Sequence, residues 1–214
     1  MKKGIVRFLI PATIVLAVIA GCWVYPLLPD QIASHWNAGG QVNGYMPKFW
    51  GTFLFPIIMA ILYVLYLVIP LIDPMKHNIE SFRKHYDAFW LVAELFFLYI
   101  FGLMIKWNFG YRFDFTLAIM PAFAVFIFIL GMLMEKTKRN WFIGIRTPWT
   151  LSSDVVWDKT HRVGGKLFKI AAVFTLISLA VPKALAVWFF IVPLLAATLI
   201  SIVYSYVVYR QERT

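Results

Sequence analysis

The strongest constraint on this chain is a series of apolar runs, each long enough to cross the hydrocarbon core of a membrane. A helix needs roughly 20 apolar residues for that crossing. The 214 residues are 62% hydrophobic and only 14% charged, which is far from the average of soluble domains. Runs such as FAVFIFILGMLM do not alternate in polarity, as the strands of a membrane β-barrel would. The sequence therefore predicts an all-α, polytopic membrane protein.

Six transmembrane helices are expected. They are placed at Ile5–Leu28, Trp50–Ile72, Asp87–Ile105, Phe113–Met134, Leu167–Val181 and Ala184–Tyr209. Pro182 and Lys183 mark a tight return between the last two spans. The expected units are residues 1–72, two spans around an extracellular loop at 29–49; residues 73–134, spans three and four; and residues 135–214, a cytoplasmic loop at 135–166 followed by a two-span hairpin.

The distribution of lysine and arginine predicts the orientation. One side would carry sixteen of the 20: Lys2, Lys3, Arg7, Lys76, Arg83, Lys84, Lys136, Lys138, Arg139, Arg146, Lys159, Arg162, Lys166, Lys169, Arg210 and Arg213. The other side would carry Lys48, Lys106, Arg112 and Lys183. Because cytoplasmic loops are enriched in these residues, both termini are expected in the cytoplasm, with the protein in the cell membrane. The net charge of +10 then reflects topology, and no direct nucleic-acid binding is expected.

Cys22 is the single cysteine, which excludes an internal disulfide and a cysteine-based metal cluster. The lysines at 2–3, an apolar stretch and Ile19–Cys22 resemble a bacterial lipoprotein signal, in which the cysteine would be lipidated. The apolar run continues past Cys22 through Tyr25, and cleavage would leave five spans. We therefore expect an uncleaved first helix.

The first extracellular loop is a candidate ligand site. Asp30 is expected to cap a short helix, Asp30–Trp36. The distinctive side chains, which would face a peptide or a lipid headgroup, are those of His35, Trp36, Asn37 and Lys48. The alternative is a loop that packs on the helix ends, with Trp36, Tyr45 and Trp50 as interfacial residues. No second His or Cys lies near His35, so neither a metal, which zinc sites bind with three or four protein ligands, nor a cofactor is expected.

The cytoplasmic loop is unusually rich in tryptophan and turn residues. Its first part, Asn140–Thr150, is expected to be extended along the membrane surface, with Trp141 and Trp149 dipping into it. The residue before Pro148 is pushed toward extended geometry, and Gly144 permits a positive φ.

A short helix is expected next, from Asp154 to about Arg162. Ser152 and Ser153 would cap its start, and Gly164-Gly165 would end it.

This helix carries the polar groups that a catalytic site would need. Trp157 and His161 would share one face, and Asp158 could pair with Arg162 four residues later. With one histidine and two carboxylates, Asp154 and Asp158, a structural role is favoured over acid–base chemistry. The chain also lacks HExxH and GxSxG motifs, so no enzyme is predicted.

The string NWFIGIRTPWTLSSDVVWDKTHRVGGK, residues 140–166, resembles the signature of the SdpI family. That family is named for a multi-span immunity protein against the sporulation-delay toxin of Gram-positive bacteria. The pattern LP…HWN…G…GY…K in the first loop, residues 28–48, resembles the uncharacterised domain often fused N-terminal to it.

The resemblance implies protection from a secreted, membrane-active toxin peptide and sequestration of a cytoplasmic transcriptional repressor. The implied partners are thus membrane lipid, the toxin and the repressor. The residues of the second motif that would form the relay or docking surface are Asn140, Gly144, Arg146, Thr147, Pro148, Trp149, Trp157, His161 and Arg162.

Glu94 is the one carboxylate well inside an apolar run. A charge at that depth costs roughly 2.5–3.5 kcal/mol on insertion scales. One interpretation is a proton or cation site, or a polar anchor for a toxin, with Asp87 on nearly the same face. With a proton or cation site, the alternative function is a small ion- or proton-coupled transporter. The other interpretation is a protonated glutamate bonded to a neighbouring helix.

Overall fold

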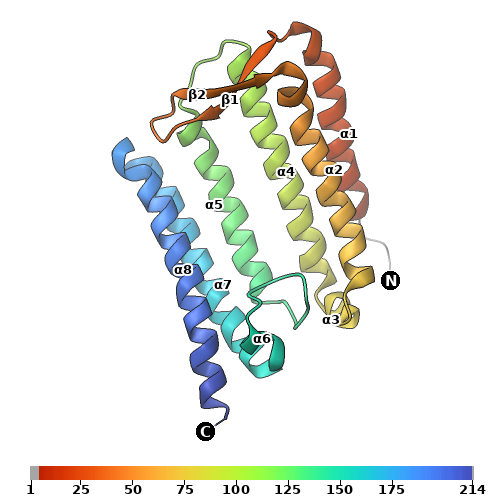
Figure 1. Ribbon diagram of the computed structural model, residues 1–214, viewed down its shortest axis with the longest axis vertical. Helices are drawn as coiled ribbons and strands as arrows, with labels where there is room; N and C mark the ends of the chain where they lie inside the picture. The colour runs from red at the N-terminus through yellow and green to blue at the C-terminus, as the bar shows by residue number, and fades with distance from the viewer. Residues whose placement is uncertain (1–4, 214) are drawn as a thin grey trace.

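The computed structural model describes residues 5–213, and most of them lie in long helices (Figure 1). Six helices are long and apolar enough to cross a membrane: α1 (Val6–Val24), α2 (Lys48–Ile72), α4 (Arg83–Asn108), α5 (Phe115–Met134), α7 (Asp154–Ile177) and α8 (Lys183–Gln211). The predicted all-α fold with six spans is confirmed, and the chain is a multi-pass membrane protein.

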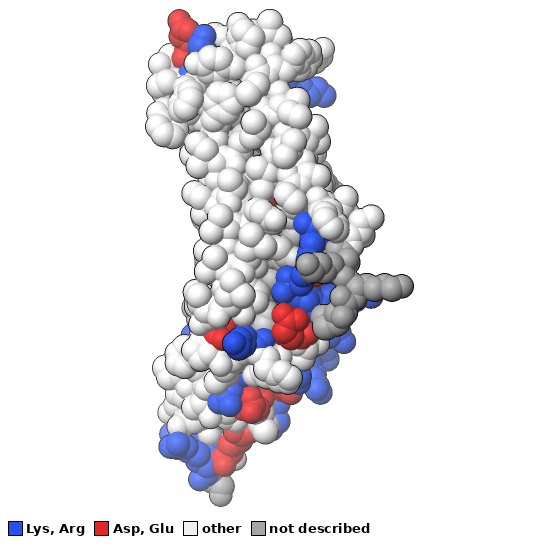
Figure 2. All heavy atoms as spheres, turned by 90° about the vertical axis from the view of Figure 1, so that its right-hand side faces the viewer, with Lys and Arg blue, Asp and Glu red and all other residues white. Residues whose placement is uncertain are grey.

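Shorter elements lie at the two ends of the bundle. They are the strands β1 (Gln31–Trp36) and β2 (Val42–Pro47), the helices α3 (Lys76–Ser81) and α6 (Pro148–Ser152), and the 3-10 turns Tyr25–Leu27 and Ser178–Ala180. The start of α1 and the end of α8 lie at the end opposite the β-hairpin (Figure 1). Figure 2 shows charged side chains at both ends and an almost uncharged belt between them, as lipid tails require. That the termini face the cytoplasm stays a prediction from the charge count.

The helices pack as two groups of three. α1, α2 and α4 enclose two apolar clusters, to which α5 adds Phe115 and Leu133, β1 adds Ile32 and α3 adds Ile79. A third cluster, which includes Ile127, Phe168 and Ala197, lies among α5, α7 and α8. α5 also contacts α4, so it joins the two groups. The predicted division into residues 1–72, 73–134 and 135–214 stays a prediction.

The prediction that Gly164-Gly165 ends a helix is wrong, because α7 runs through both residues from Asp154 to Ile177. A Cβ atom on Gly165 would lie 2.6 Å from the carbonyl oxygen of Gly131 on α5. One on Gly164 would lie 3.1 Å from Oγ of Ser201 on α8. The pair therefore allows α7 to approach both neighbours closely, which is how small residues are used between membrane helices.

The predicted helix Asp30–Trp36 is also wrong, because this segment is strand β1, paired antiparallel with β2. Ile32 and Ala33 on it are buried. The N–H of Ala33 donates to Oδ1 of Asn108 at the end of α4 (2.8 Å), and Nδ2 of Asn108 donates back to the Ala33 carbonyl (3.0 Å). Asn108 thus acts as a second neighbour for β1, and these hydrogen bonds between distant segments outweigh the local helix signal.

The close contact between α5 and α7 predicts opposite outcomes for two Gly→Ala substitutions. Gly165→Ala should lower stability by about 1–3 kcal/mol, since its methyl group would meet the Gly131 carbonyl and backbone atoms cannot move aside. Gly102→Ala, on an exposed face of α4 with open space around it, should be neutral or stabilising by up to about 1 kcal/mol. Thermal unfolding in detergent micelles measures both, and equal midpoints would contradict the packing.

Candidate functional site

Residues 135–153 join α5 to α7 and are called the connector here; Asn140 lies at its centre and is fully buried. Oδ1 of Asn140 accepts hydrogen bonds from the N–H groups of Phe142 (3.0 Å) and Ile143 (2.6 Å). Its Nδ2 donates to the carbonyl oxygens of Lys138 (2.8 Å) and Ile143 (3.0 Å). One side chain therefore satisfies four backbone groups that no helix or strand pairs.

His161 joins the connector to α7. Its Nδ1 donates to the carbonyl oxygen of Trp157 (2.9 Å), and its Nε2 accepts from the N–H of Ile145 (2.8 Å). A carbonyl only accepts and an amide N–H only donates, so the ring is the neutral Nδ1–H tautomer. It stacks on Trp157 at 4.0 Å between ring centroids. Gly144 has a φ of +114° and lies against Nε2, leaving no room for a Cβ atom.

Thr147 and Thr150 form a reciprocal capping box at the start of α6. The hydroxyl of Thr147 also lies 3.1 Å from that of Ser205 on α8. Trp149 packs on Tyr206 of α8, with ring centroids 5.0 Å apart. The backbone of Thr147 is extended, as predicted for a residue before proline. The prediction that the segment stays extended to Thr150 is wrong, because α6 begins at its proline.

The polar contacts at the start of α7 differ from the predicted ones. Ser153 caps α7 by accepting from the N–H of Val156 (3.3 Å). The predicted pair of Asp158 with Arg162 is wrong, because Asp158 pairs with Lys138 of the connector (3.0 Å). Arg162 is exposed. Asp158 thus forms its ion pair with a lysine from the connector and not with the arginine one helical turn further along α7.

Two residues that the sequence analysis missed join the connector to the other helix group. Oδ2 of Asp73, just after α2, accepts from the N–H of Trp141 (2.9 Å). Nδ2 of Asn78 on α3 donates to the carbonyl oxygen of Arg139 (2.7 Å). The only local signal was the Asp73-Pro74 turn pair, which does not reveal a partner so distant along the chain.

The structure separates the predicted docking residues into a buried set and an exposed set. Asn140, Thr147, Trp157 and His161 are buried and hold the connector in place. The exposed members are Arg146, Pro148 and Arg162, with Trp149 half-buried. Nη1 of Arg146 donates to the carbonyl oxygen of Trp141 (2.8 Å), which fixes its direction on the surface.

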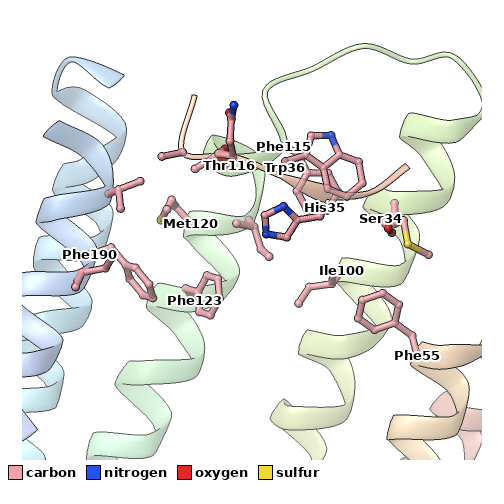
Figure 3. A pocket seen from close by; sticks show the side chains of 16 residues that line it. Ser34, His35, Trp36, Phe55, Ile100, Phe115, Thr116, Met120, Phe123 and Phe190 are labelled. Atoms are coloured by element: carbon pink, nitrogen blue, oxygen red, sulfur yellow. The ribbon is translucent and has the colours of Figure 1, made fainter. Parts of the chain in front are cut away.

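The other end of the bundle holds a largely apolar cavity of about 650 Å³ beneath the β-hairpin (Figure 3). β1 and the residues after it form its roof, and its walls come from α2, α4, α5 and α8. Labelled wall residues are Phe55, Ile100, Met120, Phe123 and Phe190.

Three of the four predicted outer-loop residues line this cavity: His35, Trp36 and Asn37. Nδ1 of His35 lies 2.5 Å from Oδ1 of Asn43. Trp36 stacks on Phe115 with ring centroids 3.8 Å apart, and its Nε1 has no hydrogen-bond partner in the described chain.

Lys48, the fourth, does not line the cavity. Its Nζ pairs with Asp30 (3.1 Å) and lies over the ring of Tyr25. Asp30 therefore holds the base of the hairpin and does not cap a helix.

Glu94 is fully buried in α4, and neither of its carboxyl oxygens has a hydrogen-bond partner among residues 5–213. The predicted hydrogen bond from Glu94 to a neighbouring helix is therefore absent among these residues. Asp87 has a different environment, since it accepts from Arg83 (2.6 Å) and from the hydroxyl of Tyr66 (3.1 Å). Asp87 thus has an arginine and a tyrosine as partners, whereas Glu94 has no polar partner among the described residues.

No group of three His, Cys, Asp or Glu side chains in the described chain could hold a metal ion. Cys22 is exposed on α1.

Comparison with known proteins agrees with the sequence motifs. Residues 136–205 match the SdpI/YfhL protein family, and residues 12–60 match a domain of unknown function (DUF1648). The chain is 26% identical to the immunity protein SdpI of Bacillus subtilis (strain 168) over 211 residues, 99% of this chain and 98% of that protein. No solved structure matches the chain. The predicted resemblance and the place in the cell membrane are confirmed.

The hydrogen bonds of Asn140 predict that a nearly isosteric substitution should loosen the connector. In Asn140→Asp, a carboxylate would face the carbonyls of Lys138 and Ile143, to which it cannot donate. We expect a loss of about 2–3 kcal/mol and new protease cleavage between residues 138 and 150. Asp158→Asn, which removes an exposed ion pair, should cost under about 1 kcal/mol. Limited proteolysis of membrane vesicles compares them, and equal protection would contradict a structural role for Asn140.

Proposed function

We propose that this chain is an integral membrane immunity protein that protects the cell from a secreted, membrane-active toxin peptide. We further propose that toxin binding leads it to sequester a cytoplasmic transcriptional repressor. The observation that supports this most strongly is the similarity to the immunity protein SdpI over nearly the whole of both chains. The family matches over residues 136–205 and 12–60 support the same assignment.

The cavity beneath the hairpin is our candidate for the toxin-binding surface. It lies at the end of the bundle that carries few lysines and arginines, which the positive-inside rule places outside the cell. Its walls are apolar, while His35 and Asn37 supply polar groups at the roof. Such a lining suits an apolar or aromatic side chain of a peptide that is already in the membrane.

The helices that line the cavity also reach the connector, which supports a relay between the two ends. α5 and α8 contribute Phe123 and Phe190 to the cavity walls. At its other end α5 leads into the connector, and Ser205 of α8 contacts Thr147 of the connector. A bound toxin that favours one spacing of α5 and α8 would also favour one conformation of the connector. The repressor would bind the connector in that conformation. Arg146 and Arg162 would form the surface that meets it.

Filling the cavity tests the first half of the proposal. Ile119→Trp on α5 should occupy the space and lower survival of toxin-treated cells at least tenfold relative to the unaltered protein. Val125→Trp places the same side chain on an exposed part of α5 and should protect fully. Colony counts after challenge with the sporulation-delay toxin are compared at equal membrane abundance. Equal protection by both variants would exclude the cavity as the toxin site.

Removing an exposed cation tests the relay. Arg146→Ala should leave toxin survival intact, because it lies far from the hairpin, yet abolish recovery of a cytoplasmic DNA-binding repressor with the protein from toxin-treated cells. Lys159→Ala, an exposed cation of α7, is the matched control and should recruit normally. Recruitment that survives both Arg146→Ala and Arg162→Ala would reject this surface.

A second candidate function is proton- or ion-coupled transport, favoured by the burial of Glu94 without a partner among the described residues. This function requires pH-dependent flux in proteoliposomes that Glu94→Gln abolishes. Absence of flux with the unaltered protein would remove the candidate.

A further inference from the structure

A cleft of about 660 Å³ lies between the start of α1 and the end of α2, with α3 and α4 behind it. It is at the end of the bundle opposite the hairpin cavity, on the side that Figure 2 faces. Two arginines, one glutamate and two tyrosines line it together with apolar residues. None of the features used above for toxin binding or repressor docking lies here.

Arg7 is the first unusual feature of this cleft. It is half-buried at the start of α1, and no ion pair or hydrogen bond joins it to another of residues 5–213. Taking a charge partly out of water without a partner is unfavourable. Its guanidinium is therefore available to pair with an anion.

Arg83 forms the second cationic wall, and it is already oriented. Its Nε donates to Asp87 (2.6 Å), and its Nη2 donates to the hydroxyl of Tyr66 (3.0 Å). The guanidinium also lies over the rings of Tyr66 and Tyr86. Nη1 has only a long contact with Glu80 (3.4 Å), a residue that is half-exposed. One donor of Arg83, a residue that lines the cleft, is thus weakly occupied.

The rim of the cleft also carries exposed apolar side chains. Phe8 is 68% exposed and Leu71 is 74% exposed, beside the two arginines. These residues belong to the start of α1 and the end of α2, at the end of the bundle opposite the hairpin (Figure 1). A small soluble anion would need the cations but would leave the rim uncovered. A molecule with a phosphate head and acyl chains would use both.

We propose that this cleft binds an anionic phospholipid, with the headgroup phosphate on Arg7 and on Nη1 of Arg83 and an acyl chain along Phe8 and Leu71. Asp87 holds Arg83 in position and is not displaced. Glu80 competes with the phosphate for Nη1 of Arg83. Its removal is therefore expected to strengthen binding of the phosphate at Nη1.

The experiment titrates phosphatidylglycerol into the purified full-length chain in zwitterionic micelles and follows the thermal unfolding midpoint. A saturable rise that phosphatidylcholine does not reproduce is expected. Arg7→Gln should weaken apparent affinity about five- to tenfold, the effect of losing one charge-assisted contact. Glu80→Gln should strengthen it about two- to fivefold. Arg213→Gln, an exposed cation near the C-terminus on the other helix group, is the matched control and should stay within twofold.

Three results would overturn the proposal. One is an equal loss for Arg7→Gln and Arg213→Gln, which would mean unspecific attraction to cations. Another is competition by inorganic phosphate or glycerol 3-phosphate at comparable concentration, which would identify a soluble anion as the ligand. The third is weaker binding by Glu80→Gln. Since Glu80 is half-exposed, its removal is not expected to prevent folding, so this arm remains informative if Arg7→Gln is unstable.

Discussion

The hydrogen bond from the N–H of Ile145 to Nε2 of His161 holds the connector against α7, and much of the architecture at the end opposite the hairpin depends on it. A non-helical segment packed between helices must find partners for its backbone groups inside the protein. Asn140 and His161 supply them, and Gly144 makes the room. Because these side chains are buried, the main role of the motif that resembles the SdpI family is to stabilise the fold of the connector. Of the predicted docking residues in it, Arg146, Pro148 and Arg162 are exposed.

The same connector brings the two helix groups together. Asp73 and Asn78 bind its backbone from the first group, while Ser205 contacts it from α8. At the far end α5 and α8 line the hairpin cavity, and Lys183 pairs with Asp114 across their ends. A change in the spacing between α5 and α8 would therefore alter both the hairpin cavity and the connector. That geometry supports a relay and gives α5, the helix that contacts both groups, the central position in it.

Several predictions failed for a common reason: the partner that decided the structure lies far away in the sequence. Gly164-Gly165 have the pattern of a helix end, but in α7 they serve close contacts with α5 and α8. The segment after Asp30 has a plausible helix cap, but β2 and Asn108 make it a strand. Asp158 has an arginine one turn away and pairs instead with Lys138. The arginine cleft combines α1, α2, α3 and α4, so no window of sequence could have indicated it.

The sequence by itself determined the six spans, the uncharged belt and the resemblance of both motifs to their families, because long apolar runs in lipid can only become helices and because motifs are local strings. Ser153 as a helix cap and the extended residue before Pro148 were equally local and were predicted. Only the tertiary structure decided which polar side chains are buried and hydrogen-bonded to other segments, and which are exposed to solvent. That division depends on how closely helices approach one another, and this is set by contacts between segments that are distant along the chain.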